Sequence, residues 1–116
     1  NLKKIIKIIH FEIKKKMRKF LNNNKNKKIV ILDIPLLLEN KINNKKDILV
    51  FVDSKKSDIY KRLKSRNNFN KELYKKFKNI QLSLSYKKKK SKFVFKNDFT
   101  NKSAKKAIKD ILNQIK

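Results

Sequence analysis

Two short runs of consecutive apolar residues constrain the fold of this chain more than any other feature. They cover residues 29–32 and 48–52, and each is followed by an aspartate, Asp33 or Asp53. Unbroken runs rich in isoleucine and valine are typical of strands that are buried on both faces of a parallel sheet. Pro35 has no amide hydrogen, so it should end the first strand. We therefore expect strands over residues 28–34 and 48–52.

Helical patterns precede, separate and follow these strands. Apolar residues at three- and four-residue spacing predict helices over residues 2–21 and 71–79. A further helix is expected to begin after Asp53 or Ser54, either of which can cap it. A last helix is expected from Asn101 or Ser103 to residue 115. A third short strand is expected over residues 93–95. This order predicts an α/β fold, a parallel sheet with flanking helices. Ligands of such sheets bind beyond the carboxyl ends of the strands.

The composition excludes several functional classes. The chain has no Cys, no Gly and one His, which argues against disulfide scaffolds, Cys-ligated zinc and His-paired metal sites, and leaves no Gly-rich phosphate loop within these residues. The apolar runs are too short to span a membrane, and no signal peptide is visible, so we expect a cytoplasmic protein without a membrane partner. Because the sequence starts with Asn1 and a helical pattern follows at once, we expect a fragment.

The net charge of +26 suggests nucleic acid but has a simpler explanation. Only three of the 35 basic residues are Arg, and the abundant Lys, Asn and Ile all have A/T-rich codons. Surfaces that read nucleic acid favour Arg for its bidentate contacts. We therefore expect nucleic acid to bind only non-specifically, through net charge. A small Lys-rich nucleic-acid-binding or ribosome-associated protein is the alternative, and the oligomeric state stays open.

Five short motifs then occur in a distinctive order. They are Ile8-Ile9-His10-Phe11, Asp33-Ile34-Pro35-Leu36-Leu37-Leu38-Glu39, Arg62-Leu63-Lys64-Ser65-Arg66, Gln81-Leu82-Ser83-Leu84-Ser85-Tyr86-Lys87 and Phe93-Val94-Phe95-Lys96-Asn97. In order and spacing they resemble the dephospho-CoA kinase family. The chain departs from the family pattern at Phe11 and Ser83, where proline is usual, at Lys96, where aspartate is usual, and at Phe77, where a basic residue is frequent.

The resemblance implies an incomplete P-loop nucleotide-kinase fold over residues 1–116, with a helical lid at about residues 67–91. It also implies transfer of the γ-phosphoryl group of ATP to the 3′-hydroxyl of dephospho-CoA, with Mg²⁺, as the last step of coenzyme A biosynthesis. The family's Gly-rich loop and its catalytic base would lie upstream of residue 1, so the fragment alone should be inactive. A related nucleotide kinase with another acceptor is a further alternative.

On the acceptor side, the resemblance assigns Asp33 a catalytic role and the binding of Mg²⁺ through water. An aspartate after a strand can equally cap the next turn. The acceptor pocket would be formed by Pro35, Leu36, Leu37, Glu39 and His10, although the apolar residues among them also suit core packing. Glu39 can instead cap a segment, and His10 can be an ordinary helix residue.

On the nucleotide side, the resemblance assigns ATP and phosphate binding to Arg62, Arg66, Gln81, Lys87 and Asn97, with a catalytic role for Arg66. Arginine retained in a chain that otherwise uses Lys points to two-pronged phosphate contacts. Arg62 can instead pair with Asp58 one helical turn away. Lys87 lies in a run of lysines, and Asn97 can simply turn the chain. We expect Asp33 and the two arginines to face one hollow at the rim of the sheet.

Overall fold

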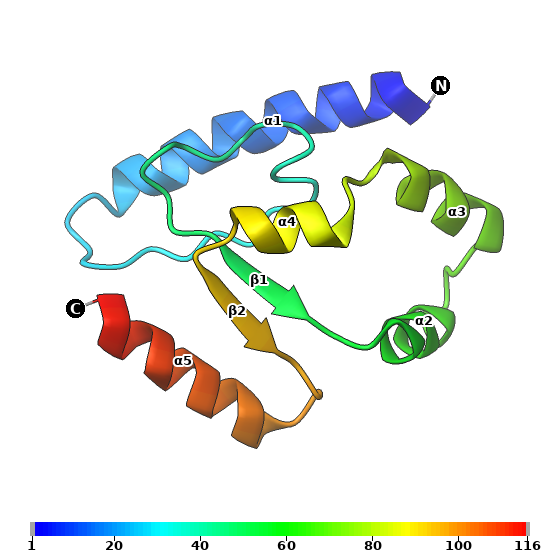
Figure 1. The fold of residues 1–116 in the computed structure, drawn as a ribbon. Coiled ribbons are helices and arrows are strands. Elements are labelled where there is room, and N and C mark those ends of the chain that lie inside the picture. Colours follow the sequence, from blue (N-terminus) through cyan, green and yellow to red (C-terminus); the bar gives the residue numbers. More distant parts are fainter. Residues whose placement is uncertain (1, 116) are drawn as a thin grey trace. The chain divides into compact units, whose positions relative to one another are not determined.

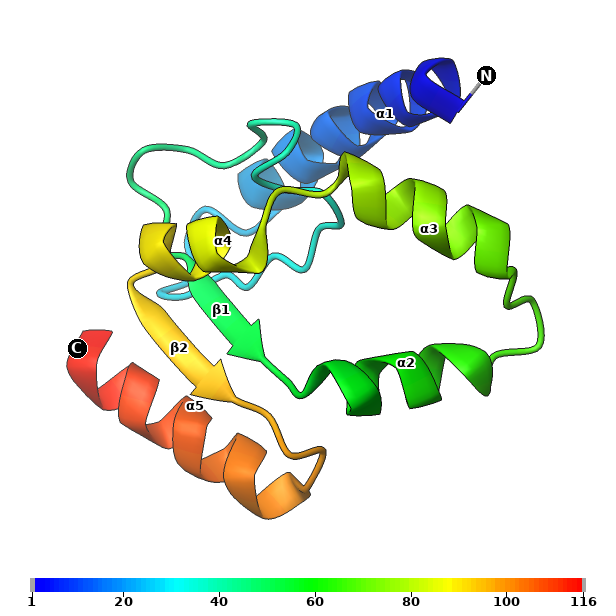
Figure 2. The same ribbon diagram turned by 45° about the vertical axis from the view of Figure 1, so that its right-hand side comes forward.

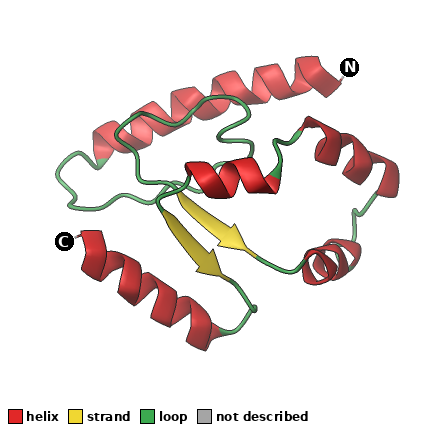
Figure 3. Cartoon of the chain, in the orientation of Figure 1, coloured by secondary structure: helices red, strands yellow, loops and turns green. Residues whose placement is uncertain are grey.

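The computed structural model describes residues 2–115, which form five helices and one two-stranded sheet (Figures 1 and 3). The elements are α1 (Leu2–Asn23), β1 (Val50–Asp53), α2 (Lys56–Lys64), α3 (Lys71–Ile80), α4 (Leu84–Lys90), β2 (Phe93–Lys96) and α5 (Asn101–Ile115). The chain divides into two compact units, residues up to Asn44 and residues from Lys45. No helix within residues 2–115 has the length and apolar character needed to cross a membrane.

The first unit consists of α1 and the irregular segment that follows it. The helix predicted over residues 2–21 is confirmed and continues for two more residues, to Asn23. Both the amide and the side-chain Nδ2 of Asn24 donate to the carbonyl of Phe20, at 3.1 and 2.8 Å. These bonds satisfy a carbonyl that the end of a helix would otherwise leave open.

The strand predicted over residues 28–34 is wrong. The segment is extended, but no strand pairing is formed there in the described part of the chain. Ile31 is 82% exposed, so the expectation of burial on both faces also fails. Side chains along residues 29–35 alternate between exposed and half-buried, as in a strand with one covered face. Strand propensity reflects packing on a pleated surface, and without a neighbouring ladder the apolar run stays an unpaired extended segment.

The second unit contains the parallel sheet, which confirms the α/β fold class. β1 and β2 pair in parallel, with Val50 opposite Phe93 and Asp53 opposite Lys96. The strands expected over 48–52 and 93–95 are thus present, with β1 shifted by one to two residues towards Asp53. Parallel neighbours need a long crossover connection, which α2, α3 and α4 provide (Figure 2). α5 packs against β2, whose Phe93 is buried with 9% exposure.

The crossover helices begin at different kinds of cap. Asn70 caps α3 by accepting hydrogen bonds from the amides of Glu72 and Leu73, and Ser83 caps α4. α2 starts after Lys55 without a side-chain cap, so the expected capping by Asp53 or Ser54 is wrong. The carboxylate of Asp53 instead accepts from Lys88, because Asp53 is the last residue of β1 and points towards α4.

An aromatic cluster joins α2 to α3. The rings of Tyr60, Phe69 and Tyr74 lie with their centroids 5.7–6.2 Å apart, in edge-on and tilted arrangements. Such arrangements suit the charge distribution of aromatic rings and contribute beyond the area they bury. The region expected to form a helical lid therefore contains two helices, α3 and α4, with a small packed centre of its own at the α2–α3 end.

Candidate functional site

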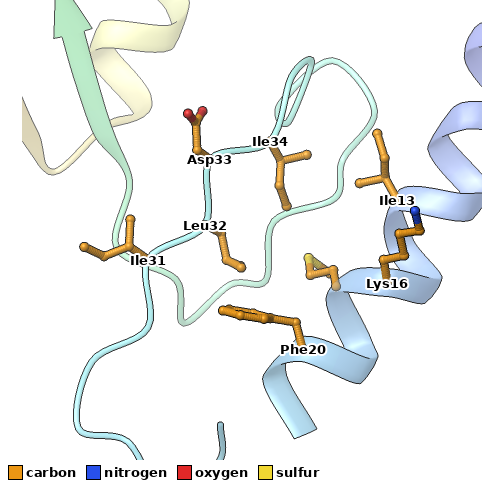
Figure 4. A pocket seen from close by; sticks show the side chains of 8 residues that line it. Ile13, Lys16, Phe20, Ile31, Leu32, Asp33 and Ile34 are labelled. Carbon is orange, nitrogen blue, oxygen red and sulfur yellow. The ribbon is translucent and has the colours of Figure 1, made fainter. Parts of the chain in front are cut away.

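Asp33 lies on the exposed side of the extended segment in the first unit. In Figure 4 its carboxylate points away from Phe20, whereas its neighbour Leu32 points towards that ring. The extended segment and α1 border an open hollow of about 240 Å³. Its walls are apolar except for two residues, and it is lined by Ile13, Lys16, Met17, Phe20, Ile31, Leu32, Asp33 and Ile34. The expected carboxylate is therefore presented at the surface beside an apolar depression.

A hydrated Mg²⁺ ion fits a single carboxylate of this kind. Within residues 2–115, no group of three or more acidic or histidine side chains is placed to hold a metal ion. Mg²⁺ in phosphoryl-transfer sites keeps several waters and takes only one or two protein carboxylates, with substrate phosphates as the other ligands. Asp33, which is exposed, could supply one such contact through water.

The segment from Pro35 to Lys41 is a series of turns. Leu36 and Lys41 have positive φ angles, of 54° and 52°, in a chain without glycine. The amides of Asn40 and Ile42 donate to the carbonyls of Leu36 and Leu37, which closes the turns. The three leucines 36–38 and Glu39 are half-buried here. The apolar wall expected from Pro35, Leu36 and Leu37 is thus packed only in part.

His10 is a half-buried residue of α1. Its Nε2 atom is buried and has no hydrogen-bond partner among the described residues. His10 is therefore a residue of α1 whose Nε2 atom is not satisfied within residues 2–115, and its role stays a prediction. A buried polar atom without a partner is costly, which leaves Nε2 available to a bound group.

Arg62 does not form the ion pair with Asp58 that the sequence left open. Within residues 2–115 its guanidinium makes no ion pair and instead lies over the ring of Phe99, with Cζ 3.9 Å from the ring centroid. This is a close cation–π stack. Phe99 follows Asn97 in the turn between β2 and α5. The structure thus brings Arg62 of α2 against the turn that contains Asn97.

The other predicted phosphate-binding residues are dispersed along the crossover. Arg66 is exposed in the turn after α2, and Gln81 is exposed at the end of α3, where its amide bonds to the carbonyl of Phe77. Lys87 is half-buried in α4, and its carbonyl accepts from the hydroxyl of Ser91. These three residues thus lie on different elements of the crossover.

The turn after β2 is held by a dense set of hydrogen bonds. The amide of Asn97 donates to the carbonyl of Asp53 at 2.8 Å, and its side-chain oxygen accepts from the amide of Phe99 at 2.9 Å. Asp98 accepts from both the amide and the hydroxyl of Thr100, at 3.0 and 2.6 Å. The hydroxyl bond lowers the pKa of the Asp98 carboxyl to about 2, because it stabilises the ionised form. The prediction that Asn97 turns the chain is consistent with these contacts.

The sequence reasoning missed three residues of this turn, Asp98, Phe99 and Thr100. A signal for two of them was present, since Asp and Thr before a helix often form local side-chain-to-backbone bonds. Thr100 does so here, accepting from the amide of Ser103 in the first turn of α5. Nothing in the sequence pattern indicated that Phe99 would lie under Arg62.

Comparison with known proteins shows similarity to one protein family. The family model described as dephospho-CoA kinase matches residues 1–105. A dephospho-CoA kinase of Wolbachia pipientis wMel is 29% identical over 99% of this chain, and one of Wolbachia sp. subsp. Brugia malayi is 26% identical over 99%. The chain spans about 60% of the length of both relatives. No solved structure gives a significant match.

Proposed function

We propose, since this chain belongs to the dephospho-CoA kinase family, that it supplies the acceptor and lid parts of an enzyme that phosphorylates dephospho-CoA. The reaction moves the γ-phosphoryl group of ATP to the 3′-hydroxyl of dephospho-CoA, in the cytoplasm, as the last step of coenzyme A synthesis. The observation that carries this proposal is the family match over residues 1–105, which includes all five motifs. The parallel sheet also supports this proposal, since β1 leads into α2, which carries Arg62, and β2 leads into the turn that contains Asn97.

The acceptor side of this function rests on the first unit. Asp33 would hold the hydrated Mg²⁺ ion, and when bound the ion neutralises charge on the phosphates of ATP. The turns from Pro35 through Leu36 and Leu37 to Glu39 would contact dephospho-CoA. His10 has an Nε2 atom that lacks a partner within the described chain, and it would be a further acceptor contact. Each of these roles is positioning, which is the main contribution of a protein to phosphoryl transfer.

The nucleotide side rests on the second unit. Arg62 and Arg66 would bind phosphate oxygens with two N–H groups each, and Arg66 would stabilise charge on the transferred group. Gln81 and Lys87 would contribute from the lid, and Asn97 would contact ATP beside the β2–α5 turn. Both arginines are exposed in this structure, so their guanidinium edges are accessible to an anion.

Catalysis also requires a phosphate loop that these residues do not contain. A Gly-rich loop needs backbone amides that approach the phosphates closely, and the 116 residues include no glycine. We therefore expect the chain by itself to bind substrates without turning them over. The loop must come from a segment outside these residues.

Specific nucleic-acid binding receives no support from the distribution of charge. Exposed lysines occur on every helix from α1 to α5. A basic surface spread in this way is the result expected from codon bias. It would give weak binding to polyanions that declines steeply with salt.

The central experiment joins the chain, in family order, to the part of the Wolbachia pipientis relative that it does not cover. ADP release is then measured with ATP, Mg²⁺ and dephospho-CoA. We expect turnover that depends on dephospho-CoA in the joined protein, and none in the 116-residue chain. Calorimetry can also measure whether dephospho-CoA binds saturably to the 116-residue chain alone. This second readout does not depend on the joined protein. Absence of both turnover and binding would contradict the proposal.

A matched pair of variants tests the arginine roles in the same assay. Arg66→Lys keeps the charge but removes the planar guanidinium with its paired N–H donors. We expect turnover to fall by about tenfold or more. Arg18→Lys makes the same chemical change on α1, outside the proposed site, and should leave turnover within about twofold of the parent. Equal effects of the two substitutions would remove Arg66 from the proposed machinery.

A further inference from the structure

Phe99, which lies outside the predicted site, has an unusual backbone conformation. It has a φ angle of 64°, in the left-handed region that bulky residues avoid. A residue persists in that conformation only where the surrounding structure imposes it. Phe99 is half-buried in the turn of residues 97–100, which connects the carboxyl end of β2 to the first turn of α5.

The turn imposes this conformation from both sides of Phe99. Before it, Asn97 is bonded to the end of β1 through its amide and to the amide of Phe99 through its side chain. After it, Asp98 bonds twice to Thr100. These bonds fix the backbone of Phe99 to the end of the sheet, so the position of the ring is fixed with it.

The ring is placed against a single cation. The Cζ atom of Arg62 lies 3.9 Å from the ring centroid, which is the distance of direct stacking. The other cation–aromatic pairs of the described chain are longer, with Lys64–Tyr60 at 5.3 Å and both Lys90–Tyr86 and Lys92–Phe93 at 5.7 Å. The contact at Phe99 is therefore closer than contacts that arise from the abundance of lysine.

Stacking uses the flat face of the guanidinium and leaves its edge open. The N–H groups of arginine lie in the guanidinium plane, and they match two oxygens of one phosphate group. Arg62 is exposed and makes no side-chain ion pair within residues 2–115. A side chain held on one face in this way has fewer rotamers to lose when an anion binds.

We propose that Phe99 is the positioning residue of Arg62, with its ring holding the guanidinium so that the free edge receives two phosphate oxygens of a nucleotide. This proposal rests on the proposed function, because it deepens the phosphate role assigned there to Arg62. Phe99 itself touches no phosphate. A ring that merely ties α2 to the β2–α5 turn is the competing explanation.

Phe99→Gly separates the two explanations. Glycine accepts a positive φ without steric cost, so this variant should keep its urea unfolding midpoint while it loses the ring. We expect inorganic tripolyphosphate to bind about tenfold more weakly to the variant than to the parent chain, at low salt. Because the two chains carry the same charge, non-specific attraction of the anion cancels from this comparison. Tyr86→Leu, which removes the ring beside Lys90, is the matched control and should leave affinity unchanged.

A double-mutant cycle tests whether Phe99 acts through Arg62. Arg62→Lys alone should weaken binding about tenfold, and adding Phe99→Gly to it should weaken binding by less than about twofold more. Independent, multiplying effects would overturn the proposal, since a positioning residue has nothing left to position once the fork is gone. A lowered unfolding midpoint of Phe99→Gly combined with unchanged affinity would support the structural tie and also overturn it.

Phe99→Trp supplies a spectroscopic readout, because the chain contains no other tryptophan. The indole ring can stack on the guanidinium of Arg62 as the phenyl ring does, so we expect the affinity for tripolyphosphate to stay within about twofold of the parent. Tryptophan emission should change saturably as tripolyphosphate is added. The emission change should disappear when Arg62→Met is added. An emission change that survives Arg62→Met would overturn the proposal.

These outcomes separate failure of this inference from failure of the proposed function. If the parent chain binds tripolyphosphate saturably and Phe99→Gly binds it equally well, only the role of Phe99 is rejected. If the parent chain shows no saturable binding, the phosphate role of Arg62 is rejected together with it. Turnover of dephospho-CoA by the joined protein remains the separate criterion for the kinase function.

Discussion

The two apolar runs that look alike in the sequence have different fates in the structure. Residues 29–32 and 48–52 are both short, β-branched and followed by an aspartate. The second run leads into β1, which pairs with β2 and ends in an ion pair between Asp53 and Lys88. The first remains unpaired, with Ile31 at 82% exposure and Asp33 at the surface.

The difference shows that strand character requires a partner as well as a pattern. In the second unit, a crossover returns the chain to the side of β1 and supplies the parallel partner. In the first unit, α1 covers one side of the extended segment, but no ladder forms within the described residues. The following variants test that contrast.

The largest effect is expected from removing the buried ring of β2. Phe93→Ala should lower the free energy of unfolding of the second unit by about 3–5 kcal/mol, because it leaves a cavity at a buried position. Ile31→Ala, at the exposed position of the unpaired run, should change the free energy of unfolding of the first unit by less than about 0.5 kcal/mol. Urea denaturation followed by circular dichroism measures both. Similar losses in the two variants would show that residue 31 is packed after all.

A proline scan sharpens the same contrast at the backbone. The backbone amide of Phe93 donates to the carbonyl of Leu49, just before β1, and that of Asn97 donates to Asp53 at the end of β1. The backbone amide of Phe95 lies on the same edge of β2 between them. Phe95→Pro should therefore cost about 3 kcal/mol, with loss of the ladder. Ile31→Pro removes no ladder bond and should cost less than about 1 kcal/mol. A large loss at residue 31 would reveal strand pairing there.

The two aspartates that follow the runs should differ by a smaller amount. A double-mutant cycle of Asp53→Asn and Lys88→Met should give a coupling of at most about 1 kcal/mol, since both side chains are partly exposed. The coupling should fall as salt is added. Coupling that does not respond to salt would exclude a simple surface ion pair.

The smallest effect is confined to acid pH and concerns the turn after β2. Asp98 has a pKa of about 2 in the folded chain, below its ordinary value of 3.8. The unfolded chain therefore binds the proton more readily, and stability rises with pH between these two values. The contribution of Asp98 should be complete above pH 3.8 and lost as the pH falls to about 2. Asp98→Asn should flatten this part of a stability–pH profile.

The family followed from residue types and their order, whereas the roles of the candidate site residues stay predictions. The Asp33–Glu39 motif and the Arg62 motif were enough to indicate the family, which the match over residues 1–105 confirms. Residue-level roles could not be obtained in the same way. The pairing of Arg62 with Asp58 was reasonable from helix spacing, but the guanidinium stacks on Phe99, which is 37 positions away in the sequence. Contacts at such separations leave no local pattern.

The amino-acid sequence by itself determined the helices α1, α2, α3 and α5, the order of these elements and the family. These depend on spacing, capping and motif residues that act over a few positions, so they can be read locally. Only the tertiary structure decided which apolar run became a strand, that Asp53 pairs with Lys88, and that Phe99 lies beneath Arg62. Those outcomes depend on which distant segment comes alongside, because a ladder, an ion pair or a stack forms only when its second member is within reach.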